Sequence, residues 1–204
     1  MAILVFGGTF DPVHNGHLAI ARQARVATDA EAVWFVPAAL APLRDPPRAT
    51  PEERFELLQA AVGSLAEEGL AVLDTAVRRG GVSYTADVMD ALRAQFPELD
   101  LTVLLGADAA RTIMRWRRAE DLLGTEHFVI ANRTGPPSLD QAEVSRIGYP
   151  AARTTLLSVN SPDISASDVR DRCARGESLD GLVPAVVGAL IAAKGMYRQN
   201  RDDA

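Results

Sequence analysis

The stretch "AILVFGGTFDPVHNGHLAI" (residues 2–20) indicates the fold of the whole chain. Its first five residues, 2–6, form a continuous apolar run, which is typical of a strand buried on both faces of a parallel sheet. Gly7 and Gly8 end that run, and a helix-like segment begins a few residues later. The stretch therefore predicts a strand, a turn and a helix. In an open α/β sheet, such a turn at the carboxyl end of a strand is where ligands bind.

The same alternation of short apolar runs and longer amphipathic segments continues along the chain. The predicted strands are residues 2–6, 32–38, 70–77, 101–107, 127–132 and 154–159. The predicted helices lie within residues 49–69, 84–96, 109–123, 164–176 and 183–197. This order predicts right-handed βαβ units, and hence a Rossmann-like, doubly wound parallel sheet in a single α/β domain that spans residues 1–204.

Two of the predicted helices begin with recognisable caps. Thr50 is followed three residues later by Glu53, and Ser165 by Asp168, which is the spacing of a capping box. The stretches predicted to be loops are residues 41–51 and 133–141. Neither loop separates two halves of different composition, which favours one domain.

The composition narrows the classes of function. The chain has 204 residues, a net charge of −6 and an isoelectric point near 5.1, so we expect no nucleic-acid partner, because phosphate backbones require a basic face. Cys173 is the one cysteine, which excludes an internal disulfide and favours a cytoplasmic location. The N-terminal apolar run is shorter than a signal sequence or a membrane span, so we expect no membrane association. The sequence leaves the oligomeric state open and is compatible with a homo-oligomer.

The turn after the first strand carries the residues that suggest a chemistry. Its two adjacent glycines let the backbone approach a phosphate and offer it N–H groups. Asn15 is predicted to cap the following helix, whose positive end favours an anion. His14 and His17 lie three residues apart on one side of that helix, and Gly16 between them is expected to leave room for a ligand. This combination predicts a polyphosphate site in which imidazoles donate hydrogen bonds.

Other interpretations of the histidines are less specific. A single histidine at such a turn is more often a solvated cap or a core residue. A zinc site is the other sharp alternative, but helical zinc pairs are usually four residues apart with a glutamate nearby, and no third ligand is evident. We therefore expect no metal to be bound by the chain's own side chains.

The segment "GGTFDPVHNGHL" (7–18) resembles the signature of the bacterial nicotinate-nucleotide adenylyltransferases, which belong to the nucleotidyltransferase superfamily with the H-x-G-H motif. Further segments match that family in order: "FVPA" (35–38), "RRGGVSYTADV" (78–88), "LLGADAARTIMRW" (104–116), "NRTG" (132–135), "ISASDVR" (164–170) and "LVP…MY" (182–197). The resemblance implies that the chain joins ATP and nicotinate mononucleotide, releasing pyrophosphate and giving nicotinate adenine dinucleotide in NAD biosynthesis. The attacking 5′-phosphate is already anionic, so this reaction needs alignment and charge stabilisation rather than a general base.

The resemblance also implies roles for individual residues. The implied catalytic residues are His14, His17 and Arg170, with His17 stabilising the transition state. The residues implied to bind ATP are Gly7, Gly8, Thr9, Phe10, His14, His17, Gly106, Asp108, Arg133, Ile164, Ser165, Ser167 and Arg170. The residues implied to bind the pyridine nucleotide are Thr9, Asp11, Arg44, Tyr84, Thr85 and Trp116. The C-terminal helices, about residues 164–197, are expected to complete the ATP site, and Mg²⁺ is the implied cofactor, bound through phosphate oxygens and water.

The sequence also departs from the family pattern. Residues 41–44, "APLR", stand where the family usually has P-P-H-K, so Arg44 replaces a lysine. Glu53 replaces a histidine, Val88 a threonine and Ala166 a serine. These changes weaken the assignment of the substrate more than that of the fold or the ATP half of the site.

Three competing functions follow from these observations. A related adenylyl- or cytidylyltransferase could act on nicotinamide mononucleotide or phosphopantetheine, and a non-catalytic nucleotide-binding relative would explain the altered 41–44 segment. An aminoacyl-tRNA synthetase fragment would need a lysine-rich motif, but Lys194 is the single lysine. The segment "SYTAD" (83–87) favours the nicotinate branch, because the helix that starts there should offer hydrogen-bond donors to a carboxylate.

Overall fold

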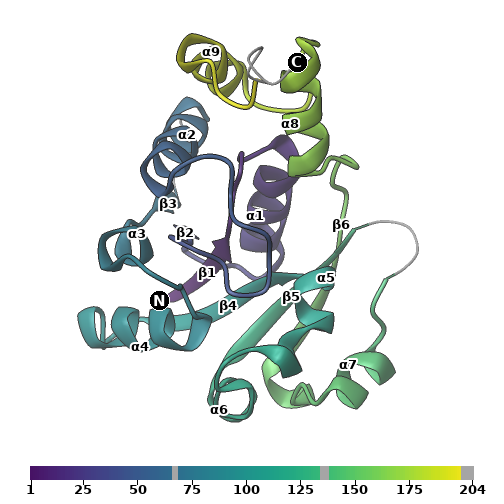
Figure 1. Cartoon of the computed structure of the whole chain (residues 1–204). Coiled ribbons are helices and arrows are strands. Elements are labelled where there is room, and N and C mark those ends of the chain that lie inside the picture. The colour runs from purple at the N-terminus through teal and green to yellow at the C-terminus, as the bar shows by residue number, and fades with distance from the viewer. Residues whose placement is uncertain (66–68, 134–137, 199–204) are drawn as a thin grey trace.

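The computed structural model describes residues 1–65, 69–133 and 138–198. Within these residues, six parallel strands form one sheet in the order β3-β2-β1-β4-β5-β6 (Figure 1). The strands are β1 (Ala2–Gly8), β2 (Ala32–Pro37), β3 (Leu70–Val72), β4 (Asp100–Gly106), β5 (His127–Arg133) and β6 (Thr154–Val159). The predicted doubly wound sheet is therefore confirmed, and its order reverses between β1 and β4.

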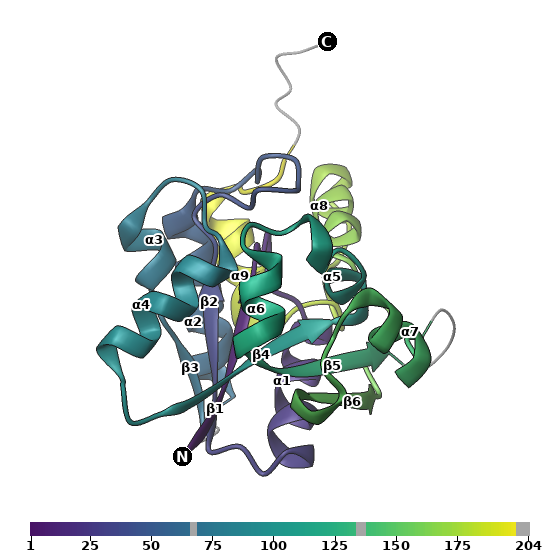
Figure 2. The same cartoon turned by 90° about the horizontal axis from the view of Figure 1, so that it is seen from below.

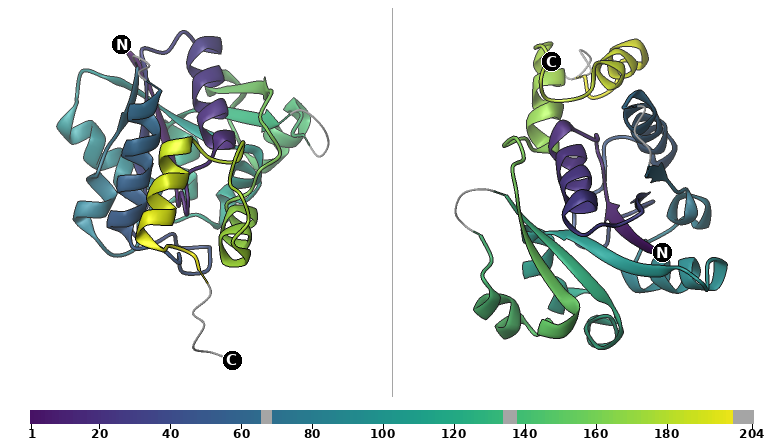
Figure 3. Two further views of the ribbon diagram at one scale, coloured as in Figure 1. Left: turned by 90° about the horizontal axis from the view of Figure 1, so that it is seen from above. Right: turned by 180° about the vertical axis from the view of Figure 1, so that it is seen from behind.

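Helices cover both faces of the sheet (Figure 2). They are α1 (Asn15–Ala27), α2 (Pro51–Ser64), α3 (Thr75–Arg79), α4 (Thr85–Gln95), α5 (Ala107–Arg111), α6 (Ala119–Thr125), α7 (Gln141–Ile147), α8 (Ala166–Arg175) and α9 (Ala185–Lys194), with 3₁₀ turns at Ile113–Arg115 and Ala151–Arg153. Buried residues of α1, α2, α8 and α9 form one apolar core with the sheet, and those of α3 to α7 form the other. The helix α9 packs beside α2 (Figure 3).

The first strand belongs to both cores. Leu4 and Phe6 point to the layer that holds α1 and α2, while Ile3 and Val5 point to the opposite layer. All four side chains are at most 6% exposed. This two-sided burial is the physical reason for the unbroken apolar run in the sequence.

Both predicted capping boxes are present. The Thr50 hydroxyl accepts a hydrogen bond from the Glu53 N–H at 3.2 Å, and the Glu53 carboxylate accepts one from the Thr50 N–H at 2.8 Å. Ser165 and Asp168 make the corresponding pair of bonds at 3.1 and 3.3 Å. These caps position the starts of α2 and α8 from local sequence alone.

The predicted strand at residues 70–77 is wrong in its second half. β3 is an edge strand that ends at Val72, and α3 begins at Thr75. Ala76, which the apolar pattern assigned to the strand, is instead buried in the helical layer. A run of this length fits a short strand followed by a short helix as well as one long strand, and periodicity does not separate the two.

The predicted helix at residues 109–123 is interrupted. Arg118 adopts a left-handed conformation with φ of 58° just before α6. Its guanidinium donates hydrogen bonds to the carboxylates of Asp90 at 2.6 Å and Asp121 at 2.8 Å. No proline or glycine marks the break. It coincides with one contact to α4, at Asp90, and one within the first turn of α6, at Asp121.

No helix in the described part of the chain has the length and apolar character needed to cross a membrane.

Phe10 makes the turn after β1 compact. Its ring is buried and lies edge-on against Phe6, Phe35 and His17, with centroid distances of 5.7, 5.8 and 5.0 Å. A Cβ atom at Gly8 would lie 2.8 Å from this ring, which is closer than van der Waals contact permits. The second glycine of the turn is therefore required by the packing of Phe10.

We predict that Gly8→Ala lowers the free energy of unfolding by about 1–3 kcal/mol, because the new methyl group overpacks the Phe10 ring. Gly7→Ala is the matched control. A Cβ atom there meets no described atom within 4 Å, so its effect should stay below about 1 kcal/mol. Urea unfolding of both variants tests this, and equal stabilities would contradict the packing role of Gly8.

Candidate active site

The residues predicted to bind ATP gather at the carboxyl edge of the sheet. β1 ends at Gly8, β4 at Gly106 and β5 at Arg133, and these three strands are neighbours. The start of α8 joins them, because the Arg133 guanidinium lies 3.5 Å from the Ile164 carbonyl. The point where the strand order reverses thus carries the turn, the histidines and the start of α8, as ligand sites in such sheets do.

The two histidines form a stacked pair at the start of α1. Their ring centroids are 3.7 Å apart with an angle of 28° between the planes. His14 is buried and His17 is half-buried. The backbone N–H of His14 donates a hydrogen bond to Nδ1 of His17 at 3.3 Å. Because Nδ1 of His17 accepts, a neutral His17 ring carries its proton on Nε2.

Both rings are held in the neutral state. Burial, helped by the charge of Arg133, lowers the pKa of His14 from 6.5 to about 4. Burial, followed by His14 and Arg133, lowers the pKa of His17 well below its usual value, and Arg44 acts in the same direction. Near pH 7 the pair therefore offers uncharged N–H donors beside a positively charged arginine.

The structure corrects the predicted role of Asn15 and shows what surrounds Gly16. The N-cap of α1 is His14 rather than Asn15, and the Asn15 side chain instead donates to the Gly181 carbonyl at 2.9 Å. A Cβ atom at Gly16 would lie 3.0 Å from Nδ1 of His14. The glycine therefore leaves room for the neighbouring imidazole, and the space it was expected to leave for a ligand stays a prediction.

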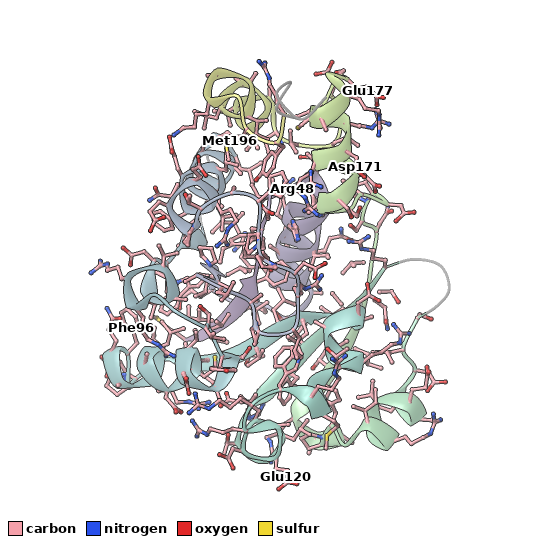
Figure 4. The ribbon with its side chains drawn as sticks, viewed as in Figure 1. Arg48, Phe96, Glu120, Asp171, Glu177 and Met196 are labelled. Carbon is pink, nitrogen blue, oxygen red and sulfur yellow. The ribbon has the colours of Figure 1, made fainter. Side chains whose placement is uncertain are left out.

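The start of α8 presents polar groups toward the turn after β1. The Ser165 hydroxyl lies 2.7 Å from the Asp168 carboxylate and 3.0 Å from the Ser167 hydroxyl. One turn further on, Arg170 donates from Nη1 to the Asp11 carbonyl at 2.7 Å. An open hollow of about 300 Å³ runs along this helix, lined by Asp163, Ile164, Asp168, Asp171, Arg172, Arg175 and Leu182. Figure 4 labels Asp171 on α8. The capping role of Ser165 is thus established, whereas its binding of ATP stays a prediction.

The carboxylate of Asp11 is engaged by the protein itself. It is 5% exposed and accepts hydrogen bonds from the N–H groups of Arg48 at 2.9 Å and Ala49 at 3.2 Å. The Tyr197 hydroxyl adds a third bond at 2.8 Å. Arg48 lies beside α8 on the face of the molecule that Figure 4 shows. Contact between Asp11 and a substrate stays a prediction.

Arg54 is a site-supporting residue that the sequence analysis missed. It is fully buried, and its guanidinium donates to the carbonyls of Thr9 at 2.6 Å, Ala39 at 2.8 Å and Ala49 at 3.2 Å. The signal was present in the sequence, because Arg54 lies on the apolar face of α2, three residues before Leu57. A charged residue at such a position requires partners.

The residues predicted to bind the pyridine ring lie around the start of α4. Tyr84 is the N-cap of α4 and supplies no side-chain hydrogen bond there. The Arg117 guanidinium stacks over the Tyr84 ring at 4.8 Å, which brings the neighbouring Trp116 segment to the same end of the helix. Asp87 pairs with both Arg117 at 3.2 Å and Arg79 at 2.9 Å. The two guanidiniums leave this corner with an excess of positive charge.

Two other predicted site residues, Asp108 and Arg44, have exposed side chains. The Asp108 side chain is 95% exposed and lies 3.6 Å from Arg111, and Arg44 is exposed in the loop before α2. Thr134 and Gly135 of the "NRTG" match lie outside the described residues. Among the residues that the structure describes, no three or more His, Cys, Asp and Glu side chains form a group that could hold a metal ion.

Comparisons with known proteins identify relatives of this chain. The profile of the cytidylyltransferase-like family matches residues 5–172. A Stenotrophomonas maltophilia protein named "Probable nicotinate-nucleotide adenylyltransferase" is 40% identical over 96% of each chain. A Rhodopirellula baltica protein of the same name is 35% identical over 95% of this chain and 92% of its own. The structure of Plasmodium falciparum nicotinic acid mononucleotide adenylyltransferase complexed with NaAD is 16% identical and shares the fold, with a TM-score of 0.81 over 96% of this chain and 97% of that one.

Proposed function

This chain belongs to the nicotinate-nucleotide adenylyltransferase family, and on that premise we propose that it transfers the adenylyl group of ATP to nicotinate mononucleotide. An oxygen of the mononucleotide 5′-phosphate attacks the α-phosphorus of ATP, the bond between that phosphorus and the β-phosphate oxygen breaks, and pyrophosphate leaves. The products are nicotinate adenine dinucleotide and pyrophosphate. The observation that carries the proposal is the stacked, neutral histidine pair at the turn after β1.

The site is suited to a reaction that needs no proton abstraction. The nucleophile is an anion at neutral pH, so the protein has to align two phosphates and stabilise the charge that moves onto the phosphoryl oxygens. A neutral His17 with its proton on Nε2 is a hydrogen-bond donor for such an oxygen. Its fixed orientation costs little reorganisation during the reaction.

The charged residues nearby fit a triphosphate. Arg133 lies close enough to both histidines to lower their pKa values, and Arg170 reaches from α8 to the same turn. This donor set is cationic or neutral, which suits phosphate oxygens rather than a bare cation. We propose that Mg²⁺ enters with ATP as part of the substrate, held mainly by phosphate oxygens and water.

The corner at α4 supports nicotinate as the acceptor base. Tyr84 makes no side-chain hydrogen bond to the backbone N–H groups of the first turn of α4, so these groups can bind another acceptor. Beside them, the guanidiniums of Arg79 and Arg117 share the single carboxylate of Asp87. A ligand carboxylate gains from these donors and charges. A carboxamide would turn its NH₂ group toward donors and leave a polar group unpaired.

The test of this function is product formation from ATP, Mg²⁺ and each pyridine mononucleotide in turn, with pyrophosphate measured alongside the dinucleotide. We predict that kcat/KM for nicotinate mononucleotide exceeds that for nicotinamide mononucleotide by about 100-fold or more. Equal or reversed preference would refute nicotinate as the substrate but keep adenylyl transfer. Absence of pyrophosphate with both nucleotides would refute the proposed reaction, and phosphopantetheine in the same assay tests the related transferases.

His17→Ala should lower kcat by about 100-fold or more, because the lost donor acts mainly in the transition state. The exposed His127, at the start of β5, supplies the matched control. His127→Ala should leave kcat within about twofold of wild type. Circular dichroism checks that both variants fold, and a folded His17→Ala variant with near wild-type kcat would remove His17 from the mechanism.

A further inference from the structure

The Asp11 carboxylate is the centre of a buried network that joins the two ends of the chain. The Tyr197 hydroxyl donates to Oδ1 of Asp11 at 2.8 Å across 186 positions of sequence. Asp11 and Tyr197 are 5% and 9% exposed. Burial and the adjacent carboxylate raise the pKa of Tyr197 above its usual value, so the hydroxyl keeps its proton and donates.

Arg170 is attached to the same residue. Its Nη1 atom donates to the backbone carbonyl of Asp11 at 2.7 Å and lies 3.8 Å from Oδ2 of the carboxylate. Nε of Arg170 is buried and has no hydrogen-bond partner among the described residues. One edge of the guanidinium is therefore fixed by Asp11, while the side chain stays 23% exposed, so N–H groups on its exposed side are open to a ligand.

The fold brings Tyr197 to this position by reversing the chain after α9. Gly195 ends that helix in a left-handed conformation, and the Met196 N–H donates back to the Ile191 carbonyl at 3.0 Å. Figure 4 shows Met196 beside α9, on the side of that helix that faces α2. The side chains of Met196 and Tyr197 belong to the same apolar core as α1 and α2. Lys194 also pairs with Glu56 of α2 at 2.6 Å, which holds the C-terminal segment in place.

The network leaves few ways to compensate for a lost bond. Oδ1 of Asp11 accepts from the Ala49 N–H and from Tyr197, while Oδ2 accepts from the Arg48 N–H. Removal of the Tyr197 hydroxyl leaves a buried carboxylate with fewer donors, which is costly. Of the two arginines near this carboxylate in the described residues, Arg54 is held by three carbonyls, so Arg170 is the one placed to satisfy it.

We propose that Tyr197 is a positioning residue for ATP binding: through Asp11 it fixes the Arg170 guanidinium against the turn after β1. Without the hydroxyl, Arg170 is drawn to the Asp11 carboxylate and away from the ligand. The role of Arg170 toward ATP rests on the proposed function, whereas the contacts among the three side chains do not. Tyr197 itself touches no reacting atom in this account.

Tyr197→Phe tests the proposal, because it removes one hydroxyl and keeps the ring. We predict that the dissociation constant of α,β-methylene-ATP with Mg²⁺ rises about 10-fold, and that KM for ATP rises with it while KM for nicotinate mononucleotide stays within about twofold. Tyr149→Phe is the matched control, since the buried Tyr149 hydroxyl donates to the Ala110 carbonyl at 3.1 Å in the other core. That variant should lower the melting temperature and leave affinity for the analogue unchanged.

A double-mutant cycle separates positioning from general destabilisation. In an Arg170→Ala background, Tyr197→Phe should change the affinity for the analogue by less than about twofold. A normal affinity in folded Tyr197→Phe, or a full effect that persists without Arg170, would overturn the proposal. If the wild-type chain binds the analogue but makes no dinucleotide, the proposed function is refuted. The role of Tyr197 is still tested in that case, because the dissociation constants of the variants decide it.

Discussion

Two buried charges fix the turn that follows β1, and the rest of the site depends on them. The Arg54 guanidinium holds the Thr9 carbonyl from one side, and the Asp11 carboxylate binds the backbone of residues 48–49 from the other. Breaking either set of bonds would leave an unsatisfied charge in the core, which costs several kcal/mol. The turn is thereby held in one conformation, with Phe10 packed inside it and His14 at the start of α1.

That turn explains how the protein presents hydrogen-bond donors at the candidate site without adding positive charge there. The buried His14 and the half-buried His17 stack on each other, and their low pKa values keep them neutral. Positive charge comes instead from Arg133 on β5 and Arg170 on α8. Neutral donors and permanent cations thus come from different elements of the fold.

The sequence predicts those parts of the molecule whose causes are local. The capping boxes at Thr50 and Ser165, the central strand and the turn before α1 follow from residues close to each other in the chain. The break around Arg118 coincides with a contact to Asp90, 28 positions away, and no proline or glycine marks it, so the local sequence did not indicate it. The capping role predicted for Asn15 was wrong for a similar reason, because its side chain bonds to the Gly181 carbonyl in a loop far away in the sequence.

The most direct measurement of the central claim is ¹⁵N NMR of the histidine side chains between pH 8 and pH 4 in the free protein. The structure predicts neutral rings for His14 and His17 at pH 7, a His17 tautomer with its proton on Nε2, and protonation of His14 near pH 4. A doubly protonated ring for either residue at pH 7, or a His17 proton on Nδ1, would contradict the account of the site as a pair of neutral, pre-oriented donors.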